Sequence, residues 1–148
     1  MKIFIYKTIE GNVCVGTSVS EDVEHVAKIT VPINTEFFIV ESESLPSEPQ
    51  DAWVLQEDGQ IKIDQQKLIE FNRKNMPSLT PIKFDIKLNN AGLYDAVQDL
   101  IKDNFELRIA YNRAIFFSRT DPLIDQARIA LNLTDEQVDE MWEKALTL

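Results

Sequence analysis

The sequence predicts an α+β protein: a small mixed strand-and-helix module at residues 1–76, a linker at 77–81 and an all-helical bundle module at 82–148. Short runs rich in β-branched and aromatic residues, separated by turn residues, occur only before Pro77. After Pro81, apolar residues recur at the three- and four-residue spacing of helices. The two prolines of residues 77–81 favour extended backbone, which places the boundary there. With 44% hydrophobic residues among 148, the chain can bury a core.

The first module reads as two hairpins, a single strand and two helices. Asp58-Gly59 lies between two β-rich runs and is a strong hairpin signal. Ser18 and Glu21 have the spacing of a capping box for a short helix, and Asp64 can cap a later one. The apolar centre of residues 36–41 indicates a strand buried on both faces. The expected elements are strands at 2–7, 13–15, 36–41, 52–55 and 61–63, and helices at 20–29 and 65–75.

The second module reads as a series of helices with recognisable starts. Asn104 can cap one helix, Asp121-Pro122 combines a cap with proline at the first helical position, and Thr134 with Gln137 forms a capping box. Acidic residues occupy the first turn of the last helix, where they interact favourably with the helix dipole. The expected helices cover residues 93–102, 105–118, 122–131 and 135–145, and the second is apolar on more than one side.

The chain is acidic, with a net charge of −10. This charge opposes direct nucleic-acid binding, because phosphate neutralisation needs clustered Lys and Arg. No Lys or Arg occurs between Lys28 and Lys62, whereas seven carboxylates do. This acidic stretch is either a solvated face or a surface that meets a basic partner or imitates nucleic acid.

No apolar run is long enough to span a membrane, and Lys2 and Lys7 interrupt the start too early for a signal peptide. We therefore expect a soluble protein of the cytoplasm, with no membrane partner. The single Cys14 lies in an apolar strand and cannot form an internal disulfide.

The sequence contains no recognisable catalytic signature. His25 is the only histidine and is expected to be a partly exposed helix residue, so nucleophile-and-base sites and zinc sites lack their usual ligands. The four glycines form no phosphate-binding loop. Paired carboxylates remain the one route to catalysis, and Asp121 and Asp125 are better explained as a helix cap and a solvated residue. We expect a non-enzymatic protein without catalytic or metal residues and without a cofactor.

Arginines and aromatic residues gather in the second module, which holds four of the five arginines. Such residues are enriched as anchors in protein interfaces. The alternatives are ion pairs within the module for the arginines and burial in the core for the rings. The candidate partner-binding residues are Arg113, Phe116, Phe117 and Arg119.

Two parts of the chain resemble small, functionally uncharacterised proteins of tailed bacteriophages and prophages, encoded in the tail or tail-fibre assembly region. The first part starts with Met1-Lys2-Ile3-Phe4-Ile5-Tyr6-Lys7 and continues through residues 11–15, 24–28, 31–32, 38–40, 45–46, 51–53 and 59–64 to a helix carrying Lys67 and Arg73. The second part comprises residues 112–114, 117–119, 121–124 and 131–139. These patterns consist of structural residues, so the resemblance carries over no functional residue.

The resemblance implies a tail or tail-fibre assembly factor of chaperone type, or a minor tail component. Its partner would be a phage tail or tail-fibre protein, and the protein would also be able to associate with itself. It would be located in the cytoplasm of the bacterial host or in the virion. The alternative is an acidic, host-directed inhibitor that presents the acidic stretch between residues 36 and 58 to a nucleic-acid-handling or defence protein.

Overall fold

The computed structural model describes all 148 residues and confirms the α+β class. The chain forms two compact units, Met1–Phe71 and Asn72–Leu148, and the division falls within helix α2 (Gln65–Lys74). The division precedes the linker predicted at 77–81, which belongs to the second unit. Leu79 is buried in that unit's core, and the indole Nε1 of Trp142 donates a hydrogen bond of 2.9 Å to the Pro77 carbonyl.

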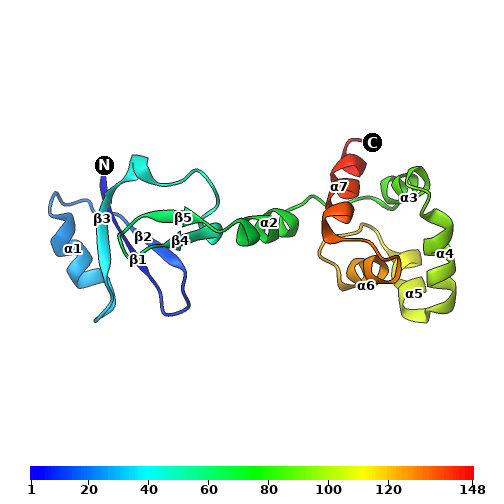
Figure 1. Cartoon of the computed structure of the whole chain (residues 1–148), viewed down its shortest axis with the longest axis horizontal. Helices are drawn as coiled ribbons and strands as arrows, with labels where there is room; N and C mark the ends of the chain where they lie inside the picture. The colour runs from blue at the N-terminus through cyan, green and yellow to red at the C-terminus, as the bar shows by residue number, and fades with distance from the viewer. The chain divides into compact units, whose positions relative to one another are not determined.

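The first unit is built on a three-stranded antiparallel sheet with strand order β2-β1-β3 (Figure 1). Phe4 and Tyr6 of β1 pack towards helix α1, whereas Ile5 contacts the cluster around Trp53 of the β4-β5 hairpin. Alternate residues of β1 thus serve two cores. The elements are β1 (Lys2–Lys7), β2 (Val13–Gly16), α1 (Val23–Thr30), β3 (Phe37–Glu41), η1 (Ser42–Ser44), η2 (Gln50–Ala52), β4 (Trp53–Leu55) and β5 (Ile61–Ile63).

Both predicted hairpins and the Asp64 cap are confirmed. Two details differ from the sequence prediction. The carboxylate of Asp22, rather than Ser18, accepts the capping hydrogen bond from the His25 amide of α1, so the helix begins at Val23. Strand β3 pairs only with β1 and leaves Ile39 39% exposed, so it is an edge strand and is not buried on both faces.

Gly16 makes room for the ring of Phe4, its neighbour on β1. A Cβ atom at Gly16 would lie 2.0 Å from the Phe4 ring, which is itself buried and cannot swing into solvent. We predict that Gly16→Ala lowers the free energy of unfolding by about 1–3 kcal/mol, the usual cost of overpacking a core. Urea titration followed by circular dichroism measures the loss. In a Phe4→Leu background the same change should cost less, and an equal cost in both backgrounds would show that the ring is not the obstacle.

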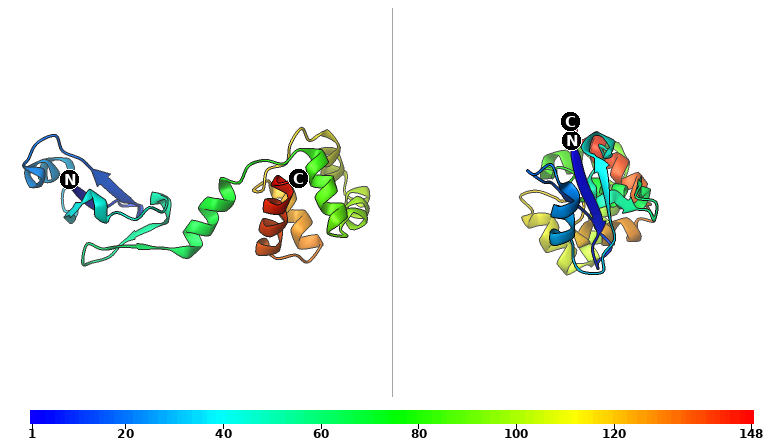
Figure 2. Two further views of the ribbon diagram at one scale, coloured as in Figure 1. Left: turned by 90° about the horizontal axis from the view of Figure 1, so that it is seen from above. Right: turned by 90° about the vertical axis from the view of Figure 1, so that its left-hand side faces the viewer.

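The second unit is a group of five helices, which lie side by side in the left-hand view of Figure 2. The predicted caps at Asn104 and Asp121 and the capping box at Thr134 are confirmed. No helix of the protein is long and apolar enough to cross a membrane. The helices are α3 (Pro81–Asn90), α4 (Tyr94–Asp103), α5 (Phe105–Arg113), α6 (Pro122–Ala130) and α7 (Asp135–Leu146).

Helix α5 ends five residues before the end predicted at Ser118. Ala114 has extended backbone angles, φ −63° and ψ 130°, which stop the helical hydrogen-bond ladder. Phe117 instead pairs with Leu79 in an isolated β-bridge, in which each amide donates to the other's carbonyl at 2.8 and 2.9 Å. Residues 114–121 therefore form a loop between α5 and α6, and three of the four predicted anchors lie on it.

Candidate protein-binding site

The loop at residues 114–121 is fixed to the core through Phe117. Besides its backbone bridge to Leu79, the Phe117 side chain stacks on Phe84 of α3 with ring centroids 4.3 Å apart. Phe117 is buried in the cluster that also contains Trp142 of α7. Its ring holds the loop in place and lies inside the unit rather than on the outer surface.

A second attachment of the loop is made by Arg119, which is only 3% exposed. Its Nε donates to Asp139 at 2.6 Å, and one terminal nitrogen donates to the Asp135 carboxylate at 2.9 Å. Arg73 also donates to Asp139, at 2.7 and 3.0 Å, so one carboxylate on α7 receives two arginines. Arg119 therefore forms ion pairs within the unit, which is the alternative role that the sequence analysis considered for the arginines.

Arg113 and Phe116, the other two predicted residues, face outwards. Phe116 is 61% exposed and its neighbour Ile115 is 84% exposed, while Ile109 on α5 is partly exposed nearby along the chain. Arg113 is exposed and makes no ion pair. We call Ile109, Arg113, Ile115 and Phe116 the Arg113 surface.

The other end of α5 offers a comparison. Phe105 is 67% exposed, much like Phe116, but the Arg108 guanidinium lies over its ring at 5.4 Å from the centroid. Arg108 also donates to the Lys102 carbonyl. This Arg-Phe pair is engaged within the helix, whereas Arg113 and Phe116 make no such contact.

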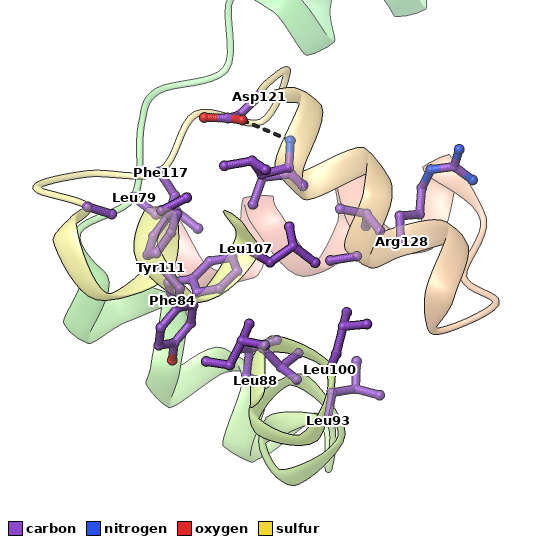
Figure 3. Close-up of a pocket in the computed structure, with 18 of the residues that line it drawn as sticks. Leu79, Phe84, Leu88, Leu93, Leu100, Leu107, Tyr111, Phe117, Asp121 and Arg128 are labelled. Carbon is purple, nitrogen blue, oxygen red and sulfur yellow. Dashed lines mark hydrogen bonds between the residues drawn. The ribbon is translucent and has the colours of Figure 1, made fainter. Parts of the chain in front are cut away.

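Ile109, Arg113 and Phe116 of the Arg113 surface also line an apolar cavity of about 380 Å³ inside the second unit. Figure 3 shows Phe84, Tyr111 and Phe117 gathered at one end of the cavity and Leu93, Leu100 and Arg128 at the other. Its size is within the range of about 300–1,000 Å³ typical of ligand pockets. A sequence without coordinates gives no signal for this cavity, because its walls come from all five helices.

Most polar side chains of the cavity lining are already engaged elsewhere. The carboxylate of Asp121 caps α6 by accepting from the Leu123 amide at 2.9 Å, as Figure 3 shows, and the Trp142 Nε1 is bonded to Pro77. Arg128 donates to Asp125 at 2.7 Å. These groups offer little to a polar ligand, so the cavity favours apolar contents.

Tyr111 ties three helices together at the aromatic end of the cavity. Its hydroxyl donates to the carboxylate of Asp85 on α3 and accepts from the Gln98 amide on α4 at 3.1 Å. Burial, reinforced by the nearby Asp85 carboxylate, raises the pKa of Tyr111 well above its ordinary value, so the hydroxyl stays protonated at neutral pH. The wall of the cavity is therefore held by hydrogen bonds as well as by packing.

The remaining sequence candidates belong to the first unit. There, His25 is exposed and Cys14 lies on β2. Of the acidic stretch, Glu41 and Glu43 lie 3.2 and 3.1 Å from the Met1 ammonium group. No three His, Cys, Asp or Glu side chains are arranged to hold a metal ion.

Comparisons with protein-family models, curated proteins and solved structures found no match to this chain.

We predict that Arg119→Ala destabilises the protein by about 3–5 kcal/mol, because it removes a buried guanidinium that donates to Asp135 and Asp139 and leaves Asp139 with Arg73 as its only arginine partner. Arg128→Ala is the matched control. Its partners Asp125 and Asp135, at 2.7 and 3.4 Å, are 54% and 36% exposed, and such exposed ion pairs contribute at most about 1 kcal/mol each. Urea unfolding of the two variants compares the costs. Equal losses would show that the Arg119 pairs are not a structural attachment.

Acid should weaken the same attachment. The hydrogen bond from Arg119 lowers the pKa of Asp135 below its ordinary value, with further contributions from Arg73 and Arg128. Because the folded pKa is lower than the unfolded one of about 3.9, this stabilisation is complete above about pH 5 and is lost as the pH falls through the folded pKa. We expect Asp135→Asn to be less stable than wild type at neutral pH and to lose less stability between about pH 5 and 2. Parallel pH profiles from thermal melting would contradict the assignment.

Proposed function

We propose that this protein is a non-enzymatic interaction protein of a phage or prophage, and that its second unit binds a tail or tail-fibre protein through the Arg113 surface during assembly. The observation that supports the contact is the exposure of Ile115 and Phe116, at 84% and 61%, beside an arginine without an ion pair. Leaving the side chains of isoleucine and phenylalanine in water costs free energy, which is recovered when a partner covers them.

The construction of the loop also favours a binding role. Phe117 and Arg119 fix the loop on the core side, so Ile115 and Phe116 project from a preformed segment. A preformed segment loses little conformational entropy when a partner binds. An arginine next to exposed aromatic and aliphatic groups has the composition of an interface anchor.

The phage assignment rests on the resemblance of stretches within residues 1–73 and 112–139 to small proteins of tailed phages. An assembly factor must hold a partner's surfaces without performing chemistry on them. An apolar surface with one unpaired arginine suits this task, because apolar contact supplies affinity and the cation supplies orientation.

We predict that Arg113→Ala and Phe116→Ala each weaken binding to a co-expressed tail-fibre protein by about 1–3 kcal/mol, the range of interface anchors. Melting temperatures should change little, since both side chains are exposed. Co-expression with the fibre protein, followed by affinity purification and calorimetry, measures the effect.

Arg108→Ala and Phe105→Ala are the matched controls, because they remove the same residue types at the other end of α5, where Phe105 is about as exposed as Phe116. They should leave binding unchanged. If the control pair and the Arg113 surface variants behave alike, the contact does not lie at Arg113. If the chain and the fibre protein do not associate at all, the assignment of the partner fails.

A second candidate function, inhibition of a nucleic-acid-handling host or defence protein, is favoured by the charge distribution. The first unit carries 13 acidic and 5 basic side chains, against 12 and 10 in the second. Glu36, Asp51 and Glu57 are exposed and are not ion-paired. Partner binding that survives Arg113→Ala but is lost on Glu36→Gln, Asp51→Asn and Glu57→Gln together would favour this inhibitor.

A further inference from the structure

We propose that the apolar cavity of the second unit is a socket for a bulky apolar side chain of the partner, carried on a segment whose carboxylate pairs with Arg113. This inference rests on the proposed protein contact at the Arg113 surface and adds the chemistry of the partner. The cavity and the surface are continuous, because Ile109, Arg113 and Phe116 belong to both.

The contents of the cavity must be apolar. The hydroxyl of Tyr111, the carboxylate of Asp121 and the indole nitrogen of Trp142 are engaged within the protein. No buried side-chain nitrogen or oxygen lacks a hydrogen-bond partner. A buried water needs about two to four polar partners, which these walls do not offer.

The size of the cavity indicates a large side chain. An apolar cavity of about 150 Å³ accommodates a benzene molecule, and this one measures about 380 Å³. A phenyl or indole group with part of a neighbouring aliphatic side chain is needed to fill such a space. Aromatic walls at one end, formed by Phe84, Tyr111 and Phe117, suit edge-to-face contact with a ring.

A protein segment explains the surface better than a free lipid does. A small amphiphile inside the cavity would leave Ile115 in water, since Ile115 is 84% exposed and does not line the cavity. A peptide segment that inserts one side chain can lie across Ile115 and Phe116 with its backbone and its other side chains. The exposed pair and the cavity are then parts of one binding site.

The charges of the lining indicate that the segment is acidic. In a chain of net charge −10, the charged lining residues are three basic ones and one acidic one: Lys87, Arg113, Arg128 and Asp121. Arg128 and Asp121 are engaged within the unit and Lys87 interacts electrostatically with Glu140, whereas Arg113 makes no ion pair. A carboxylate next to the inserted side chain would complement Arg113.

Two related dyes test this chemistry without the partner. Anilinonaphthalene sulfonate combines aromatic rings with an anion, and phenylnaphthylamine is a close neutral analogue. We expect both dyes to bind the full chain and to fluoresce at about one dye per protein. Arg113→Gln should weaken the sulfonate by about fivefold and leave the neutral dye unchanged. Absence of binding, or equal loss of both dyes, would overturn the proposal.

Cavity-filling variants locate the dye. Ala110→Phe on α5 and Ala127→Phe on α6 enlarge two lining residues on different helices. Each should weaken both dyes by about tenfold or more without lowering the melting temperature, because a new ring enters empty space. If a variant keeps its melting temperature and still binds the dyes, or if both variants unfold, the cavity is not a socket.

The same variants separate this inference from the proposed function. Loss of fibre-protein binding in the cavity-filled chain supports the socket. Binding that persists in the cavity-filled chain but is lost in Phe116→Ala overturns the socket and leaves the protein contact standing. Native mass spectrometry of the purified chain tests whether the cavity holds a lipid instead. A retained lipid would overturn the assignment to a protein segment.

Discussion

The two attachments of the loop between α5 and α6 determine which side chains of the second unit are exposed to solvent. Asp139 on α7 accepts from both Arg119 and Arg73, and Phe117 pairs with Leu79 through its backbone. With residues 117 and 119 fixed on the core, residues 114–116 cannot continue helix α5. Ile115 and Phe116 are consequently left outside, so the exposed surface is a result of buried interactions.

The choice of an ion pair for this attachment has a physical consequence. Removing Arg119 and Asp139 from water costs much of what their attraction returns, so the pair is a poor source of net stability. Apolar side chains could fill the same space, but they would tolerate small shifts in register. A guanidinium that donates to Asp139 and to Asp135 at once accepts few alternative positions. The ion pairs therefore define where the loop lies more than how strongly the unit folds.

What the sequence predicted correctly was mostly local, and two of its errors, the end of α5 and the role of Arg119, depended on distant contacts. The caps at Asn104, Asp121 and Thr134 need only a few consecutive residues, and all were predicted. Helix α3 was missed although Thr80-Pro81 has the same form as Asp121-Pro122, because the prolines were read as a linker. The end of α5 and the burial of Arg119 depend on Leu79 and α7, far along the chain. Half of the predicted anchors were therefore structural.

The early end of α5 separates two Arg-Phe pairs that look equivalent in the sequence. Phe105 and Arg108 are three residues apart within a helix, which brings the guanidinium over the ring. Arg113 and Phe116 have the same spacing in the opposite order, and a helix continuing to Ser118 would have placed them as neighbours able to engage each other. Extended backbone from Ala114 prevents this. Because Phe117 pairs with Leu79 instead of continuing the helix, Arg113 and Phe116 are left without the contact to each other that Arg108 and Phe105 make.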